Sequence, residues 1–321
     1  MKKLLFFSIL LAVLAAPVRA HCAAPAADFP GPVYVTIQAA NAVEVFPQKR
    51  LFTGLTSAHY AGASPNGKLL IVGSFTSGDV FILDTKTGQI LATFHIGKSV
   101  QGVVFTPDGH LAMAVDPNGG VVVVIDVNKR KAIRTIPVGS IPHNIGFSPH
   151  GRLAYVTLQG GSGVAVVDMK KFRKIREIPV PGVIGPHNLD FSGDGSIMWV
   201  RDTIGHVAAI DLGTGKELAV INVGRGHGGI DVAAGGKYVL TGAIADNVVD
   251  VIDPKTFKVV RRIVVGKGPH GVRSSRDGRR AYTDVTGSND LVVIDLKTLK
   301  VVRKIPTAGG NPFWVAIPGH A

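Results

Sequence analysis

One segment of roughly forty residues recurs along the chain, and this repeat constrains the fold more than any other feature. An aspartate closes each valine-rich run, at successive spacings of 42, 42, 43, 42 and 42 residues: Asp84, Asp126, Asp168, Asp211, Asp253 and Asp295. A turn position gives an independent count of seven copies: Pro65, Pro107, Pro149, Gly193, Ala233, Arg276 and Pro318. A period in the low forties with about four strand-length segments per copy is typical of a β-propeller blade. We therefore predict an all-β, seven-bladed propeller with four-stranded blades.

The third copy shows how four strands fit into one repeat. Its apolar segments predict strands over residues 144–147, 153–157, 164–167 and 175–180. Turns between the first two strands use Asn or Asp followed by Gly, residues that tolerate a positive φ: Asn66-Gly67, Asp108-Gly109, Asp194-Gly195 and Asp277-Gly278. No stretch after residue 20 has a helical apolar period of useful length.

The two ends of the chain complete each other. Residues 34–36 and 42–46 resemble the second and third strands of a copy with no first strand before them. Residues 311–321 resemble a first strand and its turn with nothing after them. Pairing the two ends would complete a blade, close the ring and remove two open sheet edges. We therefore expect one domain, a propeller over residues 33–321, preceded by a short flexible segment at 21–32.

The first twenty residues have the composition of a secretory signal peptide. Lys2 and Lys3 precede an uninterrupted apolar run at residues 4–16, which is too short to span a bilayer comfortably. We expect cleavage after Ala20, a periplasmic or secreted mature protein, and no membrane span once residues 1–20 are removed. The single cysteine, Cys22, excludes an intrachain disulfide. Lipidation of Cys22 is a further option, although His21 before it departs from the small-residue pattern.

The chain is basic, with a formal charge of +13 that falls to +10 when Lys2, Lys3 and Arg19 leave with the signal peptide. The basic residues recur at one position of the repeat, at 129–134, 171–176, 261–262 and 297–304. Such residues protect edge strands from pairing with other chains. A surface for nucleic acid is the alternative interpretation of the charge.

Histidines recur at the start of the first strand of each copy, six residues before the turn position. This slot contains His59, Gln101, His143, His187, His227, His270 and Pro312. In a four-stranded blade the innermost strands surround the axis, so the histidines should form a broken ring around one mouth of the central channel. We predict that this face binds the ligand.

Charged residues follow the second strand of several copies and should reach the same face. These are Asp116, Arg201, Asp202 and Asp284. An arginine fork binds carboxylates in bidentate fashion, so Arg201 beside several histidines suits a carboxylate-bearing ligand. Pairing of Arg201 with Asp202 is the alternative.

The histidines have two interpretations. Duplication can copy a slot whose imidazoles only bond to nearby backbone groups. Alternatively, the ring binds a metal, an anion or a flat cofactor. Imidazole nitrogens hold metal ions at about 2.0–2.1 Å, so only neighbouring histidines that lean together can share an ion. His143 and His187 are the predicted metal ligands.

The repeat also carries a family resemblance. The segments Tyr34-Val35-Thr36 and Tyr155-Val156-Thr157, the Ser-Pro turns at 64–67 and 148–151 and the Val-Val-Ile-Asp runs resemble the YVTN-type β-propeller repeat. Related propellers include the haem d1 domains of cytochrome cd1-type nitrite reductases, haem d1 biogenesis proteins and nitrous oxide reductase. The resemblance implies the fold and, as one option, a haem d1-like tetrapyrrole with His187 or His143 as axial ligand and Arg201 on a propionate. The asparagine that usually follows Tyr-Val-Thr is replaced here by Ile37 and Leu158.

No complete catalytic motif supports an enzyme. The sequence has no H-E-x-x-H, C-x-x-C or G-x-S-x-G motif. The leading hypothesis is an exported, monomeric, non-catalytic propeller that binds a small molecule or a periplasmic protein. The alternatives are a haem d1-type or metal-dependent oxidoreductase or cofactor-maturation protein, and a nucleic-acid-binding propeller. Catalytic residues are not identified.

Overall fold

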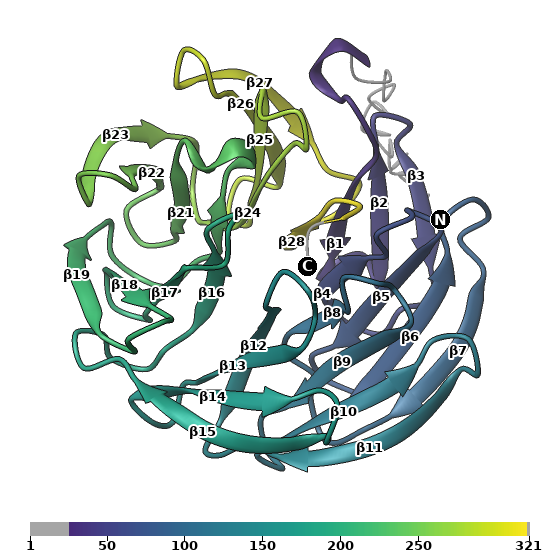
Figure 1. The fold of residues 1–321 in the computed structure, drawn as a ribbon. Helices are drawn as coiled ribbons and strands as arrows, with labels where there is room; N and C mark the ends of the chain where they lie inside the picture. The colour runs from purple at the N-terminus through teal and green to yellow at the C-terminus, as the bar shows by residue number, and fades with distance from the viewer. Residues whose placement is uncertain (1–25, 320–321) are drawn as a thin grey trace, which may run out of the picture.

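Seven antiparallel sheets of four strands each are arranged around a central axis (Figure 1). The structure is a computed structural model and describes residues 26–319. The predicted signal peptide, its predicted cleavage position and Cys22 lie outside the described residues. Within them, the non-strand elements are the short 3-10 turns η1 (Ala26–Asp28), η2 (Gln38–Ala40) and η3 (Ala234–Gly236). The prediction of an all-β propeller with seven four-stranded blades is confirmed.

The strands of each blade run in sequence order from the axis outward, except in the blade that joins the two chain ends. That blade contains β28 (Pro312–Ala316), β1 (Val33–Ile37), β2 (Ala42–Phe46) and β3 (Arg50–Thr53). The next blade contains β4 (Ala58–Ala63), β5 (Leu69–Ser74), β6 (Asp79–Asp84) and β7 (Ile90–His95). The blade after it contains β8 (Val103–Phe105), β9 (Leu111–Asp116), β10 (Val121–Asp126) and β11 (Lys131–Pro137). The following blade contains β12 (Pro142–Phe147), β13 (Leu153–Leu158), β14 (Gly163–Asp168) and β15 (Arg173–Pro179).

The remaining three blades follow the same order. They are β16 (Asn188–Phe191), β17 (Ile197–Arg201), β18 (His206–Asp211) and β19 (Glu217–Asn222); β20 (Ile230–Val232), β21 (Val239–Ala243), β22 (Val248–Asp253) and β23 (Lys258–Val264); and β24 (Pro269–Ser274), β25 (Arg280–Val285), β26 (Asp290–Asp295) and β27 (Lys300–Pro306). The four strands predicted in the third copy correspond to β12 through β15.

The ring closes where the C-terminal strand joins the N-terminal one, as predicted. β28 pairs antiparallel with β1, with Tyr34 opposite Ala316 and Thr36 opposite Trp314. Figure 1 shows the yellow β28 beside the purple β1. Closure hides two edges that would otherwise expose unpaired backbone groups.

The middle strands are almost fully buried, because each blade is covered on both faces by its neighbours. In β10, the residues between Val121 and Asp126 are all buried. This explains why the sequence there is a continuous apolar run and does not alternate. Burial of one valine or isoleucine side chain contributes about 1.5–3 kcal/mol to stability.

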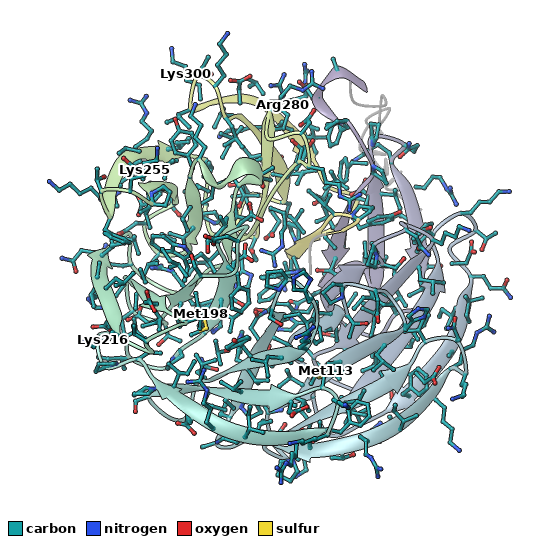
Figure 2. All side chains as sticks on the ribbon, in the orientation of Figure 1. Met113, Met198, Lys216, Lys255, Arg280 and Lys300 are labelled. Atoms are coloured by element: carbon teal, nitrogen blue, oxygen red, sulfur yellow. The ribbon has the colours of Figure 1, made fainter. Side chains whose placement is uncertain are left out.

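The outer strands are largely exposed and carry the basic residues. β15 has one buried position among seven, and Figure 2 shows Lys216, Lys255 and Lys300 projecting outward at the rim. Since the outer strand of each blade has a free edge, charges there hinder pairing with another chain.

The aspartate that marks the repeat closes the turn between the third and fourth strands. The carboxylate of Asp84 accepts the backbone N–H of Thr87 at 2.7 Å. The same kind of bond is made by Asp126, Asp168, Asp211, Asp253 and Asp295. The most regular residue of the sequence therefore serves the fold and not a ligand.

The last residues of the segment expected to be flexible at 21–32 are instead anchored. Phe29 is buried and stacks against Tyr282 with ring centroids 5.3 Å apart. The carboxylate of Asp28 pairs with Arg303 at 2.6 Å. The sequence pattern missed these contacts because both partners lie more than 250 residues away, in the blade of β24–β27.

Candidate functional site

The predicted histidine slot lies at one mouth of the channel. His143 and His270 are in β12 and β24, and His59 is in β4. His187 directly precedes β16, and His227 lies three residues before β20. We call these five residues the histidine mouth. Four of them are at most 5% exposed, whereas His227 is partly exposed. His227 is therefore the member that solvent reaches most easily.

Backbone contacts between neighbouring blades hold the histidines in place. The carbonyl of His143 accepts the N–H of Gly102 at 2.8 Å, and the carbonyl of His187 accepts the Thr157 hydroxyl at 2.8 Å. A Cβ at position 102 would lie 2.9 Å from Asn144 Cα and from His143 O, so only glycine allows this approach. The rings thus project from rigid strands.

The side chains form a circuit of rings around the mouth. The centroids are 3.7 Å apart for His143 and His187, 4.9 Å for His187 and His227, and 5.0 Å for His227 and His270. Phe313 continues the circuit, at 3.9 Å from His270 and 4.0 Å from His59. In the copy that has Pro312 in the slot, the ring of the next residue, Phe313, takes the place of the imidazole.

In the other copy without a histidine, the side chain of Gln101 takes the place of the imidazole. The Gln101 side-chain oxygen lies 3.0 Å from His59 Nε2, and the Gln38 amide nitrogen contacts His59 Nδ1. Both ring nitrogens of His59 therefore have protein partners. Within the mouth, His59 has a structural hydrogen-bonding role and no nitrogen left for a ligand.

Aromatic side chains pack directly against the histidines. Tyr60 packs against Trp314 with centroids 4.2 Å apart and meets the edge of His143 at 5.6 Å. Its hydroxyl reaches Asn188 Oδ1, in another blade, at 3.2 Å. The histidine mouth is therefore in contact with aromatic rings as well as with backbone carbonyls.

Backbone carbonyls determine the tautomers of two histidines. His143 Nδ1 lies 2.9 Å from the carbonyl oxygen of His187, and His270 Nδ1 lies 2.9 Å from that of Phe313. A carbonyl oxygen only accepts, so each Nδ1 carries the hydrogen and each Nε2 carries the lone pair. Both rings thus present a basic nitrogen on their other side.

The histidines are held in the neutral form. Burial lowers the pKa of His59 and of His143 to about 3, and for His59 the neighbouring His143 adds to the shift. Burial, followed by the neighbouring imidazoles, lowers the pKa of His187 and His270 well below the usual value. For His227, burial and then Arg201 lower the pKa. Neutral imidazoles are the form that binds metal ions.

Arg201 is fully buried at the end of β17, beside the mouth but turned into the protein. Its Nη2 donates to the carbonyls of Gly224 at 2.8 Å and Gly226 at 2.6 Å. Burial lowers its pKa to about 10, while Asp202 and Asp250 act in the opposite direction, so the guanidinium stays charged at neutral pH. A propionate or other carboxylate in the solvent-exposed part of the mouth would not reach it.

The three aspartates expected on this face bond to nearby backbone groups. Asp202 accepts the N–H groups of Gly205 and His206 and the His206 ring at 2.7 Å. Asp116 accepts the N–H of Asn118, and Asp284 that of Gly271. Burial raises the pKa of Asp284 well above its usual value, which favours the protonated form of this carboxyl. Asp202 is ion-paired with His206, and the alternative pairing of Asp202 with Arg201 is not among the ion pairs of the described residues.

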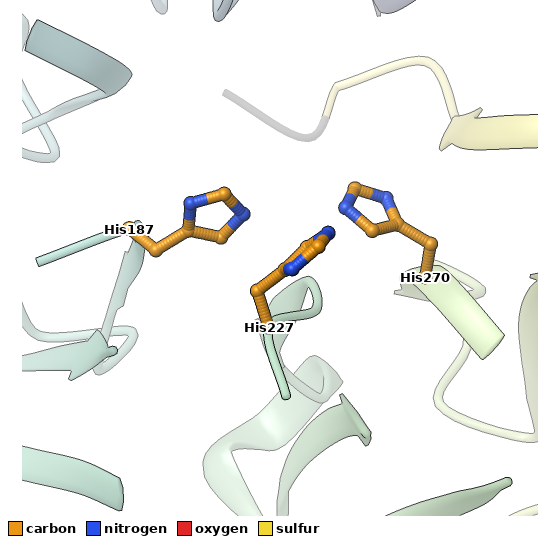
Figure 3. Close-up of side chains that lie close together, drawn as sticks. All are labelled: His187, His227 and His270. Carbon is orange, nitrogen blue, oxygen red and sulfur yellow. The ribbon is translucent and has the colours of Figure 1, made fainter. Parts of the chain in front are cut away.

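Three members of the mouth converge as a group that could hold a metal ion. One ring nitrogen each from His187, His227 and His270 lie within 4.8 Å of one another, and Figure 3 shows the three rings facing a common point. The pair predicted as metal ligands, His143 and His187, is arranged differently, because the His143 ring lies against His187 and donates Nδ1 to its carbonyl.

Two residues of the site went unrecognised in the sequence. Phe313 and Tyr60 each follow a slot position, after Pro312 and His59. Their aromatic character next to the slot was the available signal. It was not usable, because a strand pattern alone does not say which of two adjacent side chains faces the axis.

A cavity of about 300 Å³ lies away from the mouth. Its lining includes Pro30, Pro32, Tyr282, Ile317 and Pro318. This lining is mostly apolar and contains no cluster of histidines. We place the candidate site at the mouth, where polar side chains converge, and not at this cavity.

The sequence and the fold were compared with known proteins. The model of the YNCE-like beta-propeller family matches residues 112–280, just over half of the chain. No curated protein matches the sequence. Among the described residues, none of the helices is long and apolar enough to cross a membrane.

Solved structures share the fold at low sequence identity. Hydrazine synthase of Kuenenia stuttgartiensis has 21% identity and a TM-score of 0.73, covering 82% of this chain and 90% of that one. A functionally unknown protein from Desulfotomaculum acetoxidans DSM 771 has 17% identity and a TM-score of 0.77, covering 89% and 98%. Dihydro-heme d1 dehydrogenase NirN in complex with DHE has 18% identity and a TM-score of 0.67, covering 95% and 78%. At these identities the likeness extends to the fold alone.

Proposed function

The chain belongs to the YNCE-like β-propeller family, and on that basis we propose that it is an exported, non-catalytic propeller that binds a ligand in the histidine mouth. One observation carries this proposal. Neutral imidazoles from several blades meet beside the aromatic side chains of Tyr60, Phe313 and Trp314. Ring nitrogens of His187 and His270 have no hydrogen-bond partner among the described residues. Buried polar atoms normally have partners, so a ligand would supply what the protein does not.

Export is supported by the sequence at the N-terminus. The charged start, the apolar run and the small residues before His21 fit a cleaved signal peptide. Expression of the full-length chain should yield a mature protein beginning at His21 outside the cytoplasm. A cytoplasmic protein that retains Met1 would refute export without touching the ligand proposal.

Ligand binding at the mouth is tested with protein labelled with ¹⁵N in its histidines. Three probes are added separately: haem, zinc chloride and a single-stranded oligonucleotide. At least one probe should shift the ring resonances of His187, His227 and His270, and the double variant His143→Ala/His187→Ala should weaken its binding. The proposal is wrong if no probe shifts these resonances, or if the double variant binds every probe as wild type does.

A haem-type ligand is a second candidate, favoured by exposed apolar side chains on the loops of this face. Phe75 is 44% exposed, and its ring centroid lies 4.7 Å from that of His59. Ile141 and Ile184 are 49% and 66% exposed. A flat apolar ring could cover such a rim with a histidine as axial ligand. Its support includes the structural likeness to dihydro-heme d1 dehydrogenase NirN in complex with DHE. Haem titration followed by absorption spectroscopy decides it, since an unchanged spectrum of the haem excludes coordination.

A further inference from the structure

The nitrogens of the three converging histidines are close enough to share one ion. They lie within 4.8 Å of one another. A tetrahedral ion with bonds of about 2.0–2.1 Å needs ligand nitrogens about 3.4 Å apart. With His270 held by its bond to the Phe313 carbonyl, rotation of the His187 and His227 rings about their two side-chain torsions would have to cover this difference.

Two of these rings are buried with unused nitrogens. His187 has no hydrogen-bond partner at Nδ1 or Nε2, and His270 has none at Nε2, among the residues that the structure describes. His187 is 5% exposed and His270 is fully buried. A buried polar atom without a partner costs about 1–3 kcal/mol. Coordination of an ion would use nitrogens of both rings.

His270 is oriented as a metal-binding histidine usually is. Its Nδ1 donates to the carbonyl of Phe313 at 2.9 Å. Metal-ligating histidines almost always donate their other N–H to a carbonyl, carboxylate or water, which sets the ring orientation and makes the ligating nitrogen more basic. His227, which is partly exposed, leaves the site open to ions from solvent.

The donor set selects the class of ion. Three neutral imidazoles with no carboxylate suit late first-row transition metals and do not suit Ca²⁺ or Mg²⁺, which prefer oxygen ligands. Arg201 lies near and is positively charged, which opposes any cation, and the negative charges of Asp202 and Asp250 act in the opposite direction. Three protein ligands would leave at least one coordination position of a tetrahedral ion open.

We propose that His187, His227 and His270 bind one late transition-metal ion, such as Zn²⁺ or Cu²⁺, with His270 fixed by the Phe313 carbonyl. This inference rests on the proposed function, because it names the ligand of the same mouth.

The test uses zinc alone and the mature protein after treatment with a chelator. All forms carry Cys22→Ser, because Cys22 beside His21 at the new N-terminus offers separate metal ligands. Zinc chloride is titrated by calorimetry into wild type, into His227→Gln and into the matched control His95→Gln, whose imidazole is 71% exposed and far from the mouth. Circular dichroism melts verify that each variant is folded.

Wild type and His95→Gln should bind about one zinc ion per chain, and His227→Gln should bind it about tenfold or more weakly. In NMR spectra the His270 Nε2 resonance should shift while its Nδ1–H signal persists. Equal zinc affinity of His227→Gln and wild type would overturn the inference. The inference would also be overturned if chloride or sulfate, added without zinc, shifted the histidine resonances and zinc ions caused no shift of their own. If zinc fails but haem or the oligonucleotide shifts the same rings, the metal site is wrong and the proposed function stands. If no probe shifts them, both fail.

Discussion

Acid should destabilise this propeller through its buried histidines, and His143 allows the effect to be measured. The pKa of His143 is about 3 in the folded protein, against 6.5 for an ordinary histidine. The unfolded chain therefore binds more protons between these values. The resulting stability is fully present above about pH 6.5 and is lost as the pH falls toward 3.

The magnitude follows from the size of this window. Going down from pH 6.5 to about pH 4.5 covers about two pH units, and each unit corresponds to about 1.36 kcal/mol per group. His143 alone should thus cost about 3 kcal/mol of unfolding free energy at pH 4.5. Against a typical total of about 5–15 kcal/mol, this is a large loss.

The perturbation is His143→Asn, compared with wild type at about pH 7.5 and pH 4.5. The asparagine amide can still donate to the His187 carbonyl, but it does not titrate. Asp190, whose pKa is raised to about 7 by burial and then by Asp231, acts in the opposite direction in both proteins and cancels in the comparison. An exposed histidine, His150, supplies the control variant His150→Asn.

Urea unfolding followed by tryptophan fluorescence measures the free energies. Wild type and His150→Asn should lose about 3 kcal/mol more than His143→Asn on acidification. Parallel losses in all three proteins would show that His143 titrates normally in the folded state, and the account of a neutral mouth would be refuted.

Two further substitutions test a hydrogen bond between blades and a close backbone approach within one blade. Thr157→Val removes the hydroxyl that donates to the His187 carbonyl and should lower the unfolding free energy by about 1 kcal/mol, whereas an unchanged urea midpoint would contradict a role for this bond. Gly78→Ala should be far more damaging than Gly215→Ala in thermal melts. Both glycines have φ near +70°, but only at position 78 would the new Cβ lie 1.7 Å from the carbonyl oxygen of Gly97; equal melting temperatures would contradict this.

The fold was predictable because its signals are local and repeated seven times. Each Asp-closed turn and each buried valine run is encoded within a few residues, and the period near 42 makes the copies reinforce one another. Even ring closure followed from the sequence, because the two ends supply complementary parts of one blade. The position of the histidine slot at the channel mouth is a direct consequence of that topology.

The chemistry of the mouth depended on contacts between blades. Phe313 fills the gap between His270 and His59, Arg201 turns inward to two carbonyls, and His187 faces His227 and His270. The aromatic and histidine partners lie about one or more repeats apart, and Arg201 lies 23 and 25 residues from its two carbonyls. Strand periodicity does not determine the rotamers through which these side chains meet. The sequence by itself therefore determined the seven blades and the ring of slots around one mouth. Only the tertiary structure decided which imidazoles are bonded, which are left with a free nitrogen, and which three can share an ion.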